Sequence, residues 1–138
     1  MMKRLSGVRM LKAKLYFGVV VLCLLGLLLG SCARVEALEI RLAPIHEVRV
    51  NIAESYPPQV FVYIKGGLSD GCTAFHQLTT ERRGNTIYIE VATQRPKGAI
   101  CTQVYGFFEQ NVNLGSDFTS GGTYVVRVND MTTSFVMQ

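Results

Sequence analysis

Few residues of this 138-residue chain could do chemistry. There are two histidines, His46 and His76, and neither belongs to an H-x-x-x-H or H-E-x-x-H pattern, so a histidine-based metal site is not expected. The segment Gly115-Ser116-Asp117 does not fit the G-x-S-x-G pattern of a nucleophile elbow, and no phosphate-binding or dinucleotide-binding glycine loop is present. Acidic residues occur singly along the chain. The sequence therefore predicts no enzyme, no metal and no cofactor.

The N-terminal segment indicates the compartment in which the remaining residues work. Five basic residues precede an uncharged apolar run over residues 15–29. A positive start, an apolar core and small residues before a cleavage point are typical of a secretory signal. The run is also shorter than the roughly 20 residues that span a bilayer. An uncleaved membrane anchor is the alternative.

The end of this segment, Leu29-Gly30-Ser31-Cys32, resembles the lipobox of bacterial lipoproteins. The resemblance implies that residues 1–31 are removed as a signal peptide and that Cys32 receives a diacylglyceryl group. Two or more acyl chains anchor a protein stably without a membrane-spanning helix. The expected protein is exported and held by its N-terminal lipid in the cell membrane or outer membrane of a bacterium, and residues 32–44 would form a tether or a first strand.

The charge of the chain changes once the leader is removed. The whole chain has a formal net charge of +4, but from Cys32 onward nine basic residues face ten acidic ones. Nucleic-acid binding needs a basic surface, and the residues from Cys32 onward have no excess of basic side chains. We therefore expect no nucleic-acid partner.

The positions of the remaining cysteines predict their roles. Cys23 leaves with the leader, which places Cys72 and Cys101 alone in an exported domain, where disulfides persist. The spacing fits neither a C-x-x-C redox motif nor a zinc site with neighbouring histidines, although a redox pair and a metal site are the competing interpretations. We expect Cys72 and Cys101 to be joined by a structural disulfide.

The mature chain shows the pattern of short strands. Apolar and polar residues alternate in several runs, and a run that is apolar on both faces, Val60–Ile64, predicts a central strand. Gly84-Asn85 and Asn129-Asp130 each separate two such runs, as in hairpins. Loops are expected at Gly66-Gly67, at 69–71 and over 114–122, whereas 104–112 fits a strand or about two helical turns, and its surroundings favour a strand.

These features together predict the fold class. We expect an all-β domain over residues 45–138, an immunoglobulin-like antiparallel β-sandwich of about seven strands, with a small β-barrel as the alternative. Three segments resemble a group of bacterial exported domains that have an immunoglobulin-like sandwich and a G-x-Y-x-V-x-V-N terminal hairpin. The segments are Gly71-Cys72-Thr73, Cys101-Thr102-Gln103 and residues 122–129.

Three functions are compatible with this sequence. The first is a non-enzymatic binding or structural module with a protein partner in the envelope. The second is a protease inhibitor similar to the chagasin type, but the N-P-T-T-G motif is absent and Arg95-Pro96 is followed by Lys97. The third is a carbohydrate- or peptide-binding accessory domain, for which strand aromatics would form the platform and tryptophan is absent.

A binding surface is expected where the disulfide brings two loops together. Loops held by a rigid scaffold commonly carry binding residues. The pairing of Cys72 with Cys101 would gather Asp70, Arg95 and Lys97 as exposed charges at one end of the sandwich. His76 would lie near them if its strand begins at the same end.

Overall fold

The structure, a computed structural model, describes residues 17–18, 20 and 37–138. Phe17, Gly18 and Val20 are helical. The chain divides into two units, Met1–Val35 and Glu36–Gln138. The cleavage point and the expected lipid site at Cys32 lie outside the described residues. Among the described residues, no helix has the length and apolar character needed to cross a membrane.

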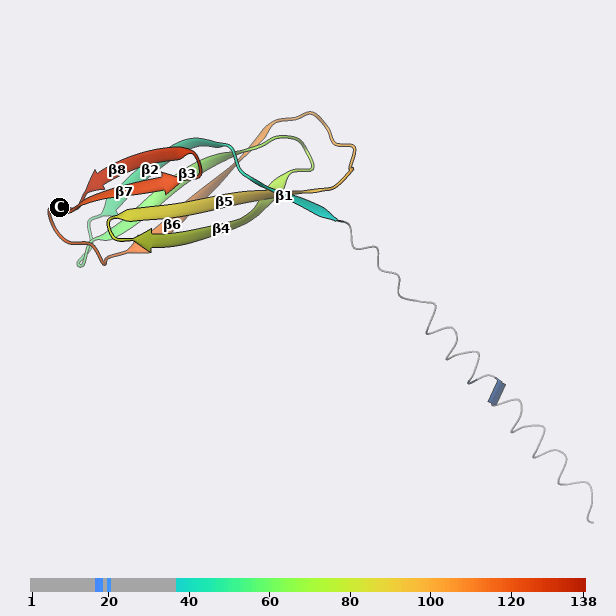
Figure 1. The fold of residues 1–138 in the computed structure, drawn as a ribbon, viewed down its shortest axis with the longest axis horizontal. Coiled ribbons are helices and arrows are strands. Elements are labelled where there is room, and N and C mark those ends of the chain that lie inside the picture. Colours follow the sequence, from blue (N-terminus) through green and yellow to red (C-terminus); the bar gives the residue numbers. More distant parts are fainter. Residues whose placement is uncertain (1–16, 19, 21–36) are drawn as a thin grey trace, which may run out of the picture. The chain divides into compact units, whose positions relative to one another are not determined.

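The second unit consists of eight β-strands (Figure 1). Their alternation of buried and exposed residues is clearest in the central strands, as expected for strands with one face on a core. The strands are β1 (Leu38–Leu42), β2 (Ile45–Ala53), β3 (Gln59–Leu68), β4 (Ala74–Arg83), β5 (Thr86–Pro96), β6 (Gly106–Gly115), β7 (Thr123–Val128) and β8 (Met131–Val136).

These strands form two sheets. The three-stranded sheet has the order β2-β3-β6 and is antiparallel throughout. In the five-stranded sheet, β4 pairs with one edge of β5, while β1 and β7 share the other edge end to end, and β8 continues outward from β7. The β5–β7 pair is parallel, unlike every other pair in the described sheets.

Asn129 closes the gap between β1 and β7 on this shared edge of β5. Its backbone adopts a positive φ of 50°, which suits the tight β7–β8 turn. Its side chain accepts a hydrogen bond from Val91 N at 2.9 Å and donates to Ala43 O at 2.7 Å and Val91 O at 3.0 Å. One amide therefore satisfies backbone groups at the point where β1 leaves β5 and the chain crosses to the other sheet.

The core lies between the two sheets and is built from β-branched residues. Val60, Val62 and Ile64 of β3 face Ile87, Ile89 and Val91 of β5 across the sandwich. All six are at most 2% exposed. Such close packing of apolar side chains supplies most of the stabilisation of a small sandwich.

The structure confirms the expected all-β sandwich and corrects several details. Residues 37–138 form eight strands in two sheets and no closed barrel, and one strand pair is parallel rather than antiparallel. Residues 38–42 form a strand, so this part of the segment 32–44 is not a tether. Residues 106–115 form a strand, and Gly66-Gly67 lies inside β3 rather than in a loop. These glycines fit a strand because aromatic side chains of the β6 region occupy the space that their side chains would fill.

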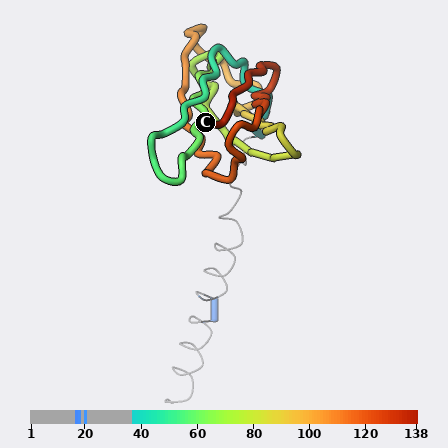
Figure 2. Tube along the Cα trace, turned by 90° about the vertical axis from the view of Figure 1, so that its left-hand side faces the viewer, coloured from blue at the N-terminus to red at the C-terminus, as the bar shows by residue number. Residues whose placement is uncertain are grey.

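The two ends of the sandwich carry different connections. The disulfide end contains the start of β1, the β3–β4 connection and the long β5–β6 loop, at the right in Figure 1. The opposite end, viewed along the sandwich in Figure 2, holds the β2–β3 connection, the β4–β5 turn and the C-terminus. We call this opposite end of the sandwich the C-terminal end.

Candidate functional site

The expected disulfide is present and joins the two loops of the disulfide end. Cys72 follows β3, Cys101 lies in the β5–β6 loop, and their sulfur atoms are 2.05 Å apart with a Cα–Cα distance of 5.5 Å. Gly71 N also donates a hydrogen bond to Thr102 O at 2.9 Å, so the loops are joined by backbone pairing beside the bond. These loops come from segments far apart in the sequence, and the disulfide joins them as a covalent staple of a small domain.

Asp70 organises the β3–β4 connection. Its Oδ1 accepts hydrogen bonds from Cys72 N at 3.0 Å, Thr73 N at 2.9 Å and Thr73 Oγ1 at 2.8 Å. This is the local side-chain-to-backbone bonding that aspartate supplies in turns. The Thr73 hydroxyl, the two backbone amides and the nearby guanidinium of Arg95 together lower the pKa of Asp70. The carboxylate is therefore held ionised inside the turn.

Arg95 reaches this turn from the end of β5. Its Nη2 lies 3.3 Å from Asp70 Oδ2 and also points to Ala99 O at 3.4 Å and Cys101 Sγ at 3.5 Å. Its Nε is buried and has no hydrogen-bond partner. The guanidinium therefore lies against the disulfide and links both loops to the five-stranded sheet.

The structure corrects the expectation that Asp70 is an exposed charge. Asp70 is 8% exposed, because Arg95 and the turn enclose it. Of the four expected binding residues, only Asp70 and Arg95 contact each other. His76 Nδ1 is instead 2.8 Å from Gln94 Oε1, and Lys97 is exposed, with its backbone nitrogen bonded to Ala37 O at 2.8 Å. The Asp70–Arg95 pair thus has the contacts of a structural link, with its oxygens already engaged.

The sequence did not predict an aromatic cluster on the outer face of the three-stranded sheet. His46 Nε2 lies 2.6 Å from the Tyr105 hydroxyl, and the rings of His46, Tyr105 and Phe107 meet edge to face at 5.4–5.7 Å between centroids. Lys65 Nζ lies 4.8 Å from the centre of the Phe107 ring, a cation–π contact. The signal that could have revealed the cluster is Gly67, whose missing side chain leaves the space that Tyr105 occupies.

A second aromatic cluster surrounds Arg82 at the C-terminal end. The guanidinium lies 4.7 Å from the centre of the Phe118 ring and 5.2 Å from that of Tyr124, and it donates to Asp117 O and Gly84 O. The Tyr124 hydroxyl accepts from Thr119 N at 2.8 Å, and this bond is the main cause of the lowered pKa of Tyr124. These contacts fix the 116–122 loop on the β-sheet.

A shallow cleft lies on the outer face of the five-stranded sheet, where β1 ends beside β7. It has a volume of about 340 Å³, at the small end of the range for ligand sites. None of the residues expected at the binding surface lines it. Its polar and aromatic lining includes Tyr88, Glu90, Arg127, Asp130 and Thr132.

In comparisons with known proteins, residues 62–137 match the family model of the ORF11 beta-sandwich domain. Two similar proteins come from Herpetosiphon aurantiacus. The uncharacterized 10.2 kDa protein in the HgiCIIM 5' region is 45% identical over 87 residues, which are 63% of this chain and 92% of that protein. The uncharacterized 10.2 kDa protein in the HgiBIM 5' region is 48% identical over 77 residues, 56% of this chain and 93% of that protein. No solved structure matches the chain.

Proposed function

This chain belongs to the ORF11 beta-sandwich domain family, and on that premise we propose that it is a lipid-anchored, non-enzymatic binding module of the bacterial cell envelope. The observation that carries the proposal is the sequence Leu29-Gly30-Ser31-Cys32 at the end of an apolar run that follows a basic start. The sandwich follows almost directly, since Ala37 is already held by Lys97. Only residues 33–36 separate Cys32 from Ala37, so the tether between the lipid and the sandwich is short.

The disulfide supports export. A bond between Cys72 and Cys101 persists in an oxidising compartment and is rarely kept in the reducing cytosol. It also suits a domain of about 100 residues, which buries a smaller share of its surface than larger domains do. The leader and the disulfide thus agree on one compartment.

The arrangement of charges supports a binding module more than an enzyme. Asp70 and Arg95, the charged residues that the disulfide brings together, use their polar atoms on each other and on the turn. A general acid or base needs a proton-transfer atom that a substrate can reach. Asp70 offers no such atom, because it is nearly buried.

Intact-mass spectrometry of the membrane fraction tests the anchor. The native chain should lose residues 1–31 and gain the mass of a diacylglyceryl group on Cys32. Cys32→Ser should abolish the adduct. Cys23→Ser is the matched control, since Cys23 lies in the apolar run and the variant should be processed like the native chain. An adduct-free mature protein in the native strain contradicts the proposal.

A second candidate function, binding of a carbohydrate or peptide, is favoured by the cleft beside β1. Tyr88 offers a ring, and Glu90 and Arg127 offer polar groups of both signs on the same wall. Glycan and peptide arrays with the native domain test it. Arg127→Ala should remove binding, whereas Arg49→Ala, which alters an exposed arginine of the other sheet outside the cleft, should leave binding unchanged.

A further inference from the structure

Large apolar side chains are exposed very unevenly on the sandwich. Most of them gather at the disulfide end or on the strand that leads to it, and few lie at the C-terminal end, where Tyr56 and Val136 are exposed. Exposed apolar groups that cluster in this way commonly mark a surface that a membrane or another protein covers. The exposed residues of the disulfide end are Leu38, Ile40, Ile100, Val104, Tyr105 and Phe107.

The tip of this end is a loop that is held in place with its apolar residue outward. The β5–β6 loop is fixed by the Lys97–Ala37 backbone bond, by the Cys72–Cys101 disulfide and by the Gly71–Thr102 backbone bond. Ile100 lies between these attachments and is completely exposed. Since the loop is attached on both sides of Ile100, the fold itself holds this side chain in an exposed position.

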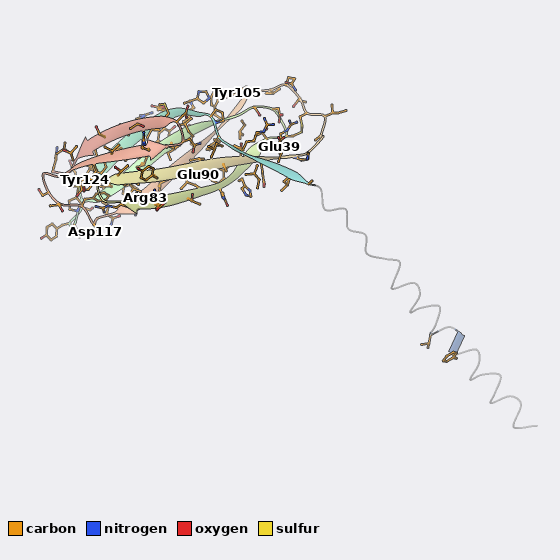
Figure 3. The ribbon with its side chains drawn as sticks, viewed as in Figure 1. Glu39, Arg83, Glu90, Tyr105, Asp117 and Tyr124 are labelled. Atoms are coloured by element: carbon orange, nitrogen blue, oxygen red, sulfur yellow. A yellow bond between two sulfur atoms is a disulfide. The ribbon has the colours of Figure 1, made fainter. Side chains whose placement is uncertain are left out.

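The aromatic cluster forms one flank of the same end. Tyr105 and Phe107 are 48% and 55% exposed, and Lys65 lies over the Phe107 ring. Figure 3 shows Tyr105 and Glu39 toward one end of the domain and Asp117 and Tyr124 toward the other. Tyrosine with an apolar ring and a polar hydroxyl, beside a long lysine, is the combination found at membrane–water interfaces.

The charges of this end do not oppose a lipid surface. Asp70 is paired with Arg95, and Glu39 is paired with Arg41. In the part of the chain that the structure describes, Lys65 and Lys97 take part in no ion pair within 4.0 Å. Lys65 is already engaged over an aromatic ring, so Lys97 is the lysine left to face anionic headgroups.

The length of chain before β1 limits how far this end can lie from the anchor. Five residue steps separate Cys32 from Ala37. At no more than about 3.6 Å per residue, they span at most roughly 18 Å even when fully extended. Ala37 is bonded to Lys97, so the β5–β6 loop begins within that reach of the acylated cysteine.

We propose that the disulfide end of the sandwich docks on the phospholipid bilayer, with Ile100 and Val104 entering the interface and Lys97 facing anionic headgroups. The inference rests on the proposed lipid anchor, which brings this end to the membrane. Docking turns the C-terminal end, with the Arg82 cluster and the β2–β3 connection, away from the bilayer. Partners in the envelope then meet that end.

A single fluorophore tests this orientation, because the chain contains no tryptophan. Ile100→Trp places an indole at the tip of the disulfide end. Tyr56→Trp is the matched control, since Tyr56 is equally exposed but lies in the β2–β3 connection at the C-terminal end. Each full-length, lipidated variant is reconstituted into vesicles of phosphatidylethanolamine and phosphatidylglycerol, with and without brominated acyl chains, after its melting temperature has been shown to match that of the native protein.

The indole at position 100 should shift its emission to the blue on reconstitution and lose most of its intensity to the brominated lipid. The indole at position 56 should do neither. Protein that floats with the vesicles while both indoles respond alike overturns the docking and leaves the anchor standing. A shift at position 100 that occurs in the unacylated Cys32→Ser background without vesicles, together with a dimer on sedimentation, assigns this surface to a second copy and also overturns the docking. A chain that is neither acylated nor able to float overturns the anchor and the docking together.

Discussion

Arg95 Nη2 lies 3.3 Å from Asp70 Oδ2, and this pair joins the end of β5 to the turn that carries Cys72. The contact explains why two residues 25 positions apart, which the sequence assigns to two loops, act as one structural unit. It places an ionised carboxylate in a nearly buried position next to the disulfide. Its consequences for stability can be measured.

Asp70 should make the stability of the domain fall in acid. The Asp70 pKa is lowered in the folded state, first by the Thr73 hydroxyl and also by Arg95, so the unfolded chain binds this proton more readily. The stabilisation is complete above the ordinary aspartate pKa of about 3.9 and is lost as the pH falls through the lowered folded value. Asp70→Asn should lower the melting temperature at neutral pH and flatten its dependence on pH in this acidic range.

Glu81→Gln provides the contrast for Asp70. The Glu81 pKa is also lowered, chiefly by its hydrogen bond with Arg83, but both side chains are at least 60% exposed. Salt screens such surface pairs, so the effect of Glu81→Gln should disappear at high ionic strength while that of Asp70→Asn persists. Equal salt sensitivity of the two variants would contradict the buried position of Asp70.

The disulfide should account for a large share of the stability. Replacing both cysteines, Cys72→Ser with Cys101→Ser, should lower the free energy of unfolding by about 2–5 kcal/mol, the usual range for a small exported domain. Urea denaturation of the oxidised and reduced native protein should show the same difference. The double variant should not respond to reductant, and free thiols in the folded native protein would count against the bond.

Asn129 should matter more than any other residue of the β7–β8 turn. Asn129→Gly preserves the positive φ but removes the three side-chain hydrogen bonds to Val91 and Ala43. Unsatisfied buried backbone groups then cost about 1–3 kcal/mol in the free energy of unfolding. Asp130→Gly, at the exposed neighbouring position, should cost much less in the same urea titration. Equal losses would show that turn flexibility, and not the amide, explains the effect.

Arg82 should not tolerate replacement by lysine, although the exposed Arg41 should. The Arg82 guanidinium stacks on Phe118 and Tyr124 and donates to two carbonyls, a geometry that an ammonium group cannot reproduce. Arg82→Lys should lower the free energy of unfolding by about 0.5–1 kcal/mol, the scale of a cation–π contact at an exposed site. Arg41→Lys alters an exposed pair with Glu39 and should leave the melting temperature almost unchanged.

Features that depend on neighbours in the chain could be read from the sequence. The apolar run Val60–Ile64 predicts a central strand, and β3 is the middle strand of its sheet. Gly84-Asn85 predicts a hairpin turn, and β4 and β5 pair on either side of it. The pairing of Cys72 with Cys101 could also be predicted, because they are the only two cysteines in the sequence after Cys32. The resemblance in residues 122–129 pointed to a terminal hairpin, and β7 and β8 form it.

Other features depended on residues that are distant in the chain. Gly66-Gly67 has the composition of a loop, but Phe108 and Tyr105 fill the space beside these glycines and keep them in β3. Asp70 has the composition of an exposed turn residue, but Arg95 arrives from β5 and encloses it.

The sequence by itself determined the β-strand pattern and the disulfide partners. Only the tertiary structure decided which charge is buried, that β7 runs parallel to β5, and that the exposed apolar residues, including Ile100, gather at one end. The physical reason is the range of the interactions involved. Strand periodicity and turn conformation arise from chemistry within a few residues, whereas burial is set by side chains that the two sheets bring together from opposite parts of the chain.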